Sequence, residues 1–419
     1  MVFVLLLVLI LAAPLVITSA VDIASAKWFL IQVMGTGLFA LWYAVGVLHG
    51  KRRIRWDPIS VMAVLVLCTQ VVSLAAATSL WPGVAVISKQ LGLLGVFLLV
   101  ANAPRAYRER IVWAVALVGG ATSVYGIAQH WGFDFFPWET HSEVPVDRGV
   151  SFFGHATFAG SALVICIPLT MGLAAAGRSR RGRLAAGTII LCMLYHLSFS
   201  GARIATVGLF VAGLAVVGAL MLARRSEDSS QGRSRGVAGA VAALAVVVAL
   251  GSALLYRAWD AKDSDLFAIK QASLAQRFYA WETAARMFAH HPILGVGVGN
   301  YAIVSPEHWN SIEAMHYARH GRRPFEVHNE YLEVALEQGL LGIAVLLGIV
   351  ACGLVGTFGL ATRARAPSER AIGIAYFGAM MATSIDATLT FTLQVPGSAI
   401  LVWVLLGLIA RELRPAPAD

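Results

Sequence analysis

The chain has 419 residues, of which 58% are hydrophobic and only 13% are charged, and its mean hydropathy is +0.74. This composition excludes a soluble globular protein, because it describes a chain that is mostly surrounded by lipid. The formal charge of +9 would favour a nucleic-acid partner in a soluble protein, so the positions of the charges decide its meaning. The four cysteines lie in apolar runs, and we expect neither a disulfide framework nor a zinc site.

Apolar runs of the length that a membrane-spanning helix needs, about 20 residues, recur along the whole chain. They lie near residues 1–20, 27–48, 58–78, 84–101, 111–130, 152–175, 184–199, 204–222, 236–256, 332–360, 371–390 and 397–410. The first run has no basic residue before it, so we expect a first span rather than a secretory signal. The sequence therefore predicts an all-α integral membrane protein with about twelve transmembrane helices.

Basic clusters follow every even-numbered span and hold 20 of the 32 Lys and Arg residues. They lie at residues 51–55, 105–110, 178–183, 224–235, 363–370 and 411–414. The positive-inside rule then predicts that both termini lie in the cytoplasm. Since the clusters are short and separated by membrane, the net charge reflects topology and membrane lipids, and we expect no nucleic-acid partner.

This topology divides the chain into three parts. Residues 1–256 hold spans 1 to 9, with an aromatic outer segment at 131–150 that we expect in the headgroup region. Residues 257–331 form a large outer loop with an amphipathic helix over 265–289, followed by the turn Gly295–Gly299. Residues 332–419 hold the last three spans.

His328 lies where the large loop enters the tenth span. In the first turn of that helix it would feel the positive end of the macrodipole and stay neutral, as a general base must. The alternative is an interfacial histidine that is hydrogen-bonded to a neighbour, and local sequence favours neither. Glu333 and Glu337 share one face of the same helix, where carboxylates usually face a cavity or a basic partner.

Arginines on the outer side need an explanation, because topology does not require them there. Arg203 lies in a very short outer loop, and Arg277 begins the amphipathic part of the large loop. Guanidinium groups match phosphate oxygens, so these two arginines predict a lipid phosphate or diphosphate site. For Arg277 the alternatives are a salt bridge to Glu282 or a solvated helix face.

Three further residues are weaker candidates. Lys89 lies inside the fourth span and Arg148 just before the sixth, and either could simply extend to the headgroups. Asp386 is the only carboxylate of the eleventh span, and pairing with an arginine is its simplest role.

Several motifs occur together in the C-terminal half, and in this order the chain resembles the O-antigen ligase and polymerase superfamily of bacterial membrane glycosyltransferases. The resemblance is looser over residues 153–168, and the first 130 residues match in topology only. The motifs are Ser200–Arg203, Arg277, Ala284–Met287, His291–Asn300, His328–Glu333 and Glu337–Gly342.

The resemblance implies a GT-C-like fold in the bacterial inner (plasma) membrane, with the active site facing the periplasm. Similarity is greatest to the ligases, whose donor is a glycan on undecaprenyl diphosphate and whose acceptor is a sugar hydroxyl of the lipid A core. His328 matches the essential histidine of the family, and Arg203 and Arg277 match its two diphosphate-binding arginines. Lys89 and Arg148 match further donor-site positions less closely, and Asp386, Tyr331 and Glu333 match supporting positions.

These roles predict a single displacement that inverts the anomeric centre. His328 would take the proton of the acceptor hydroxyl while the arginines neutralise the departing diphosphate. Some membrane glycosyltransferases give the leaving-group task to a metal held by acids in the first outer loop, but here Asp22 is the only acid of that loop. We therefore expect no metal requirement and no cofactor.

Two kinds of alternative remain open from the sequence. An O-antigen polymerase or a protein O-oligosaccharyltransferase would use the same donor with a different acceptor. A lipid-linked sugar flippase, or another transporter, would also have twelve spans and intramembrane charges. No half-to-half repeat is visible, and the charged candidates gather on the outer side rather than at the midplane, which disfavours transport.

Overall fold

A computed structural model describes residues 1–50, 54–136, 138, 148–177, 179–225, 266–320 and 326–414. These residues form helices, and no strand occurs among them. The elements are α1 (Val2–Leu15), α2 (Ile23–Leu30), η1 (Ile31–Gly35), α3 (Thr36–Leu48), α4 (Pro58–Ser73), η2 (Leu74–Ala76), α5 (Leu80–Ala101), α6 (Arg105–His130), η4 (Ser151–Phe153), α7 (Ala156–Ala176), α8 (Arg180–Ser200), α9 (Arg203–Arg225), α11 (Leu266–His290), α12 (Tyr301–Val304), η6 (Ser305–His308), α13 (Ser311–His320), α14 (Glu330–Arg363), α15 (Pro367–Asp386) and α16 (Pro396–Leu413).

Within the described ranges, nine helices are long and apolar enough to cross a membrane, and α2, η1 and α3 together form one of them. The all-α membrane fold expected from the sequence is therefore confirmed. Two predicted spans differ from expectation, since α1 has only 14 residues and α15 is not among the nine. The predicted ninth span, near 236–256, lies outside the described residues.

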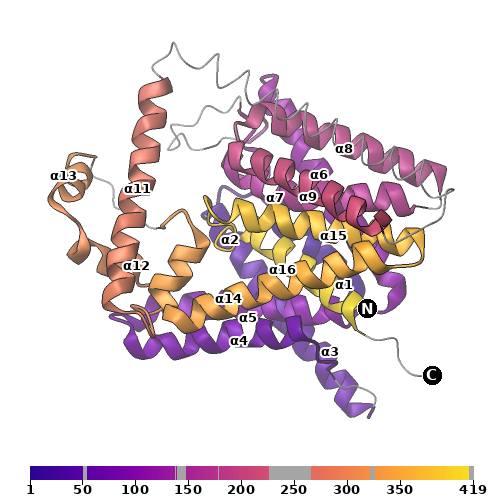
Figure 1. Ribbon diagram of the computed structural model, residues 1–419, viewed down its shortest axis with the longest axis horizontal. Coiled ribbons are helices and arrows are strands. Elements are labelled where there is room, and N and C mark those ends of the chain that lie inside the picture. Colours follow the sequence, from indigo (N-terminus) through magenta and orange to yellow (C-terminus); the bar gives the residue numbers. More distant parts are fainter. Residues whose placement is uncertain are drawn as a thin grey trace.

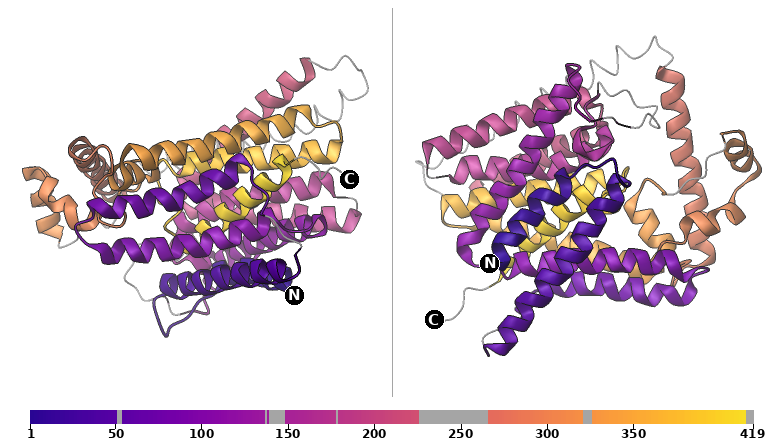
Figure 2. Two further views of the ribbon diagram at one scale, coloured as in Figure 1. Left: turned by 90° about the horizontal axis from the view of Figure 1, so that it is seen from below. Right: turned by 180° about the vertical axis from the view of Figure 1, so that it is seen from behind.

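The helices pack as one bundle with an appendage at one end (Figure 1). Helices α11 and α13 project beyond the ends of α4, α5 and α14, which we call the loop end, while the N-terminus and the C-terminal end of α16 lie toward the other end (Figures 1 and 2). Helix α16 runs through the middle and is buried along most of its length. Its core neighbours include Phe97 of α5, whose ring meets Trp403 edge to face at 5.9 Å.

At the end opposite the loop end, a buried arginine joins three helices. The guanidinium of Arg414 donates to the Asp57 carboxylate at 2.9 Å, the Ala101 carbonyl at 2.6 Å and the Ser60 hydroxyl at 3.1 Å. These contacts bring the last residue of the basic cluster at 411–414 to the start of α4 and the end of α5. The cluster at 411–414 thus lies at the same end of the bundle as Asp57, which follows the cluster at 51–55, and as Arg108 of the cluster at 105–110, which pairs with Glu412 at 3.3 Å.

A buried lysine holds the N-terminal helices against the middle of the chain. The Lys27 side chain is only 2% exposed, and its ammonium donates to the carbonyls of Pro14 and Phe152, each at 2.6 Å. It also lies 5.0 Å from the ring centre of Phe153. Two carbonyls and an aromatic face therefore replace the water that a buried ammonium loses.

The part of the large loop that the structure describes is helical, as predicted, with α11 spanning Leu266–His290. Arg286 fixes α11 to α13, because its guanidinium contacts the carboxylate of Glu313 in α13 at 2.8 Å. It also pairs with Glu282 of its own helix at 2.7 Å. Burial raises the pKa of Glu313, although Thr283 and Arg286 act in the opposite direction. In the segment predicted to lie among headgroups, Trp131 is highly exposed, which suits that position.

Candidate active site at the loop end

His328 lies two residues before helix α14 begins, and its backbone is left-handed, with a φ of 57°. Asn329 caps the helix, because its side-chain oxygen accepts a hydrogen bond from the Leu332 N–H at 3.1 Å. The prediction that His328 occupies the first helical turn is therefore wrong. A positive φ outside glycine is uncommon and is often kept at functional sites, where the surroundings enforce it.

The imidazole of His328 is mostly enclosed by other side chains. Its ring lies 4.9 Å from the ring of Phe391, in an edge-to-face arrangement. Burial lowers the pKa of His328 to about 4, and the nearby Arg277 and His155 add to the decrease. His328 is therefore neutral at pH 7 and able to accept a proton, for reasons of burial and charge rather than of the helix dipole.

A second histidine belongs to this site, although the sequence reasoning did not select it. His155 caps α7, because its Nδ1 accepts the Thr157 N–H at 3.1 Å. Burial lowers the pKa of His155, and so do the charges of Arg148 and Arg277. The available sequence signal was the looser family resemblance over residues 153–168, which includes His155.

Aromatic packing connects the two histidines. The ring of His155 lies 5.0 Å from that of Phe158, which meets Phe391 edge to face at 5.2 Å. Because Phe391 also contacts His328, the start of α7 and the segment before α14 share one aromatic cluster. This cluster brings residues more than 170 positions apart in the sequence to one place.

Two arginines lie near the histidines, since the charges of Arg148 and Arg277 lower the pKa of His155, and a third, Arg203, follows the turn at Gly201. The guanidinium of Arg148 lies over Gly201, where an added methyl group would be 3.9 Å from its Nη1. Arg203 begins α9 directly after this turn, and its side chain is exposed. Arg277 comes from α11, and burial lowers the pKa of its guanidinium.

The salt bridge considered for Arg277 does not form, since Glu282 pairs with Arg286 instead. Among the residues that the structure describes, Arg148, Arg203 and Arg277 have no carboxylate at ion-pair distance. Guanidinium groups without acidic partners form a surface that attracts anions, and their planar forks suit phosphate oxygens.

Asp386 is fully buried, but its partners are hydroxyl groups rather than an arginine. Its Oδ2 accepts hydrogen bonds from Thr390 at 3.0 Å and Thr392 at 2.8 Å. The expected pairing with an arginine is therefore absent from the described contacts of Asp386. The carboxylate instead fixes the loop after α15, which carries Phe391 to the ring of His328.

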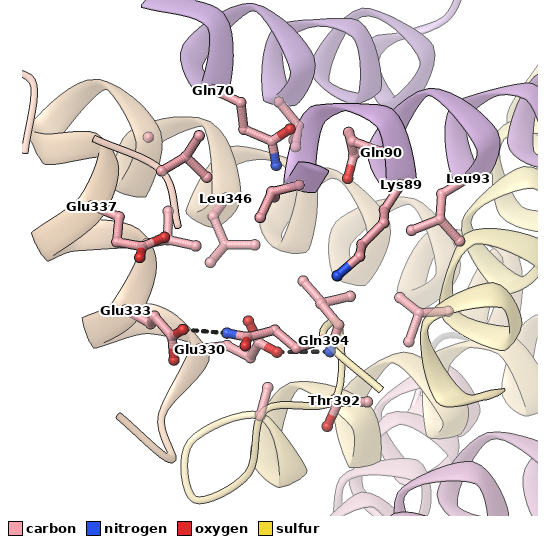
Figure 3. Close-up of a pocket in the computed structure, with 18 of the residues that line it drawn as sticks. Gln70, Lys89, Gln90, Leu93, Glu330, Glu333, Glu337, Leu346, Thr392 and Gln394 are labelled. Carbon is pink, nitrogen blue, oxygen red and sulfur yellow. Dashed lines mark hydrogen bonds between the residues drawn. The ribbon is translucent and has the colours of Figure 1, made fainter. Parts of the chain in front are cut away.

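A cavity of about 480 Å³ lies beside this cluster, enclosed by α2, α4, α5, α14 and the segment 392–394. Its lining includes Glu326 and Glu330, which flank His328 in the sequence. Burial raises the pKa of Glu326, which lies outside the helix. Figure 3 shows Lys89 pointing into this space from one side and Glu330 and Gln394 facing it from the other.

Three buried glutamates lie along one face of α14 and tie separate loops to it. Glu330 accepts the Leu393 N–H at 2.7 Å, and Glu333 accepts the Val327 N–H at 3.1 Å and the side-chain amide of Gln394. Glu337, one turn further, accepts N–H groups from the turn after α11. Of the two predicted surroundings of Glu333 and Glu337, a cavity or a basic partner, the structure shows the cavity, and their hydrogen-bond donors are amides.

Lys89 and Tyr331 both line this cavity. The ammonium of Lys89 lies 5.2 Å from the ring centre of Trp28, and the Tyr331 hydroxyl donates to the Ser384 carbonyl at 2.9 Å. Lys89 thus lines the cavity, and its predicted contact with the donor stays a prediction.

The glycine turn meets a break in α14. Gly339 has φ 67° and ψ −161°, which interrupts the helix. The carbonyls freed by the break accept the Val296 N–H at 2.9 Å and the Gly297 N–H at 3.0 Å, and the Leu340 N–H donates to Pro292 at 2.8 Å. The turn thus satisfies the backbone groups that a broken membrane helix exposes.

Together, the fold and this site define a polytopic helical membrane protein with a histidine and arginine cluster at one end of its bundle. The O-antigen ligase family matches residues 188–347 of the chain. This match supports a member of the O-antigen ligase and polymerase family, and no curated protein matches the chain. The matched range includes Arg203, Arg277 and His328, whereas Lys89, Arg148 and Asp386 lie outside it.

Proposed function

We propose that the protein is an O-antigen ligase, which transfers a glycan from undecaprenyl diphosphate to a sugar hydroxyl of the lipid A core. The proposal places it in the bacterial inner membrane, with both termini in the cytoplasm and the loop end in the periplasm. The family match supports the ligase or polymerase class. The basic clusters, which follow every even-numbered predicted span, support this orientation of the chain in the membrane.

The observation that carries the proposal is the approach of Arg277 and His155 to the neutral imidazole of His328. His328 takes the proton of the acceptor hydroxyl as its oxygen attacks the anomeric carbon. The bond from that carbon to the diphosphate oxygen breaks, and undecaprenyl diphosphate leaves with the electron pair. One such displacement inverts the anomeric centre.

Charge on the departing diphosphate is neutralised by Arg203 and Arg277, with Arg148 beside them. Guanidiniums that have no carboxylate partner among the described residues are suited to charge that grows in the transition state. We propose that no metal is required, in part because the carboxylate of Asp22 is already engaged as the cap of α2, accepting the Ser25 N–H at 2.8 Å.

Reconstitution of the purified protein in EDTA tests this function. The assay supplies undecaprenyl-diphosphate glycan as donor, with and without lipid A core, and resolves the products on a gel. We expect product on the lipid A core from the wild-type protein and none from His328→Ala, with donor binding nearly unchanged. Retained transfer by His328→Ala, or a need for added metal, would contradict the mechanism.

A polymerase is the second candidate, because the family match includes that class. The same assay separates the two, since a polymerase lengthens the glycan on the donor lipid without lipid A core. A protein O-oligosaccharyltransferase would transfer only to a polypeptide. A flippase would give no covalent product under any of these conditions.

A further inference from the structure

The cavity beside His328 has two chemically different parts. Its wall near the loop end is polar, with Gln70, Lys89, Gln90, Glu330 and Gln394 around the open space (Figure 3). Other lining residues are apolar and include Leu346, Trp403 and Leu406. A cavity of this volume with a few convergent polar groups is typical of a small-molecule site.

Two amides in the polar wall lack complete hydrogen bonding. Gln70 is 6% exposed and Gln90 is 7% exposed, and each has one amide atom without a protein partner. A buried amide without a partner costs about 1 to 3 kcal/mol. Such a cost is commonly retained where a ligand completes the bonding.

The charges of the wall select among possible ligands. Five acidic residues line the cavity, namely Asp22, Glu326, Glu330, Glu333 and Glu337, whereas Lys89 is its only described basic residue. Five carboxyl groups beside one ammonium disfavour a phosphate, because they offer it few hydrogen-bond donors and any ionised carboxylate repels it. The group of arginines near the histidines is positively charged instead. Arg148, Arg203 and Arg277 have no carboxylate partner within the described residues.

The wall also mixes donors with acceptors. An ammonium and amide N–H groups donate, while amide oxygens and carboxylates accept. A sugar hydroxyl does both, so a hydroxyl-rich ring can satisfy the two kinds of group at once. Since Glu326 and Glu330 line the cavity and lie two residues before and after His328 in sequence, the cavity reaches the segment that carries the proposed base.

We propose that this cavity receives an unphosphorylated sugar of the acceptor glycolipid, held through its hydroxyl groups by Gln70, Lys89 and Gln90. The inference rests on the proposed transferase function. It divides the site into a cationic donor side, formed by the arginines, and a neutral or acidic acceptor side, formed by the cavity.

Acceptor kinetics in the reconstituted system test this assignment. The donor is kept saturating, the lipid A core is varied, and the variants are Gln70→Leu and Gln90→Leu. Thr357→Val is the matched control, because Thr357 is fully buried and its hydroxyl bonds only to its own helix. Thermal unfolding of each variant is measured in parallel.

We expect each glutamine variant to raise the acceptor KM by about three- to tenfold, as loss of one uncharged hydrogen bond predicts. The donor KM and the kcat at saturating acceptor should stay near wild type. The Tm should be unchanged or higher, because each substitution removes a buried amide that lacks a partner in the free protein. A merely structural role would lower the Tm instead.

An acceptor KM within about twofold of wild type in both variants would overturn the assignment. A rise in the donor KM rather than the acceptor KM would also overturn it, and would place the donor in this cavity. These outcomes differ from failure of the proposed function, in which the wild-type protein itself would transfer no glycan to the lipid A core.

Discussion

The carboxylate of Glu337 accepts the backbone N–H of Gly299 at 2.8 Å, and its second oxygen accepts that of Tyr301 at 3.0 Å. One side chain of α14 thereby holds the turn that follows α11 and reaches α12. Because Glu333 lies one turn earlier and holds Val327, the segment with His328 is fixed to the same helix face.

Glu337→Gln should destabilise the protein by about 1 to 3 kcal/mol, because one of the two N–H groups would meet an amide donor instead of an acceptor. The decrease in Tm measures this effect. The same substitution at Glu369, an exposed residue in the first turn of α15, should leave the Tm nearly unchanged. Equal effects at both positions would contradict the role given to Glu337.

Gly339→Ala should prevent normal folding or lower the free energy of unfolding by at least about 2 kcal/mol, which a strong decrease in Tm would show. The position combines a φ of 67° with a Cβ that would lie 2.1 Å from the Ile293 carbonyl oxygen. Gly359 on the same helix has nothing within 4 Å of an added Cβ, so Gly359→Ala should be neutral or stabilising. A stable Gly339→Ala variant would show that the break in α14 is not required.

Folding stability should decrease as the pH falls from 6.5 toward 4. The pKa of His328 is lowered from 6.5 to about 4 in the folded protein. Between these values the unfolded chain binds a proton that the folded chain does not, so protonation favours unfolding. His155 shares the direction of this shift.

The Tm of His328→Asn should therefore fall less than that of the wild type when the pH is lowered from about 7.5 to 5. His49→Asn is the control, since His49 is exposed. An unchanged pH dependence in His328→Asn would show that the imidazole is not protected from protonation in the folded state.

Arg414→Met should destabilise the end opposite the loop end by about 3 to 5 kcal/mol, because it leaves the buried Asp57 carboxylate without its cation. Arg108→Met is the comparison, as the Arg108 and Glu412 pair is partly exposed at 3.3 Å. Exposed pairs contribute about 0.2 to 1 kcal/mol. Similar Tm values for the two variants would contradict this difference in burial.

The sequence indicated the helical spans because their apolar runs are long. It indicated the turn at Gly295–Gly299 because closely spaced glycines are typical of a tight turn. It did not reveal the break at Gly339, since residues 332–360 form one apolar run. The break depends on hydrogen bonds to residues 292–297, which are remote in sequence. Tertiary partners of this kind are not visible in a local pattern.

The candidate site shows the same limit. His328 and Arg277 could be selected from their residue types and their places in the predicted topology. His155 was missed, because its role depends on a cap and on neighbours from two other segments. Asp386 was expected to pair with an arginine, but it accepts hydrogen bonds from Thr390 and Thr392. Thr390 ends the predicted eleventh span and Thr392 lies just beyond it, so the sequence did not indicate that both belong to one loop.

The Lys27 ammonium has implications for how the protein is made. One of its two acceptors, the Pro14 carbonyl, precedes it in the chain, but the other, the Phe152 carbonyl, follows it by 125 residues. Until the ribosome has delivered residue 152, this ammonium lacks half of its hydrogen-bond acceptors and must keep contact with water or lipid headgroups. The packing of α1 and α2 against the segment before α7 is therefore completed only after residue 152 has been synthesised.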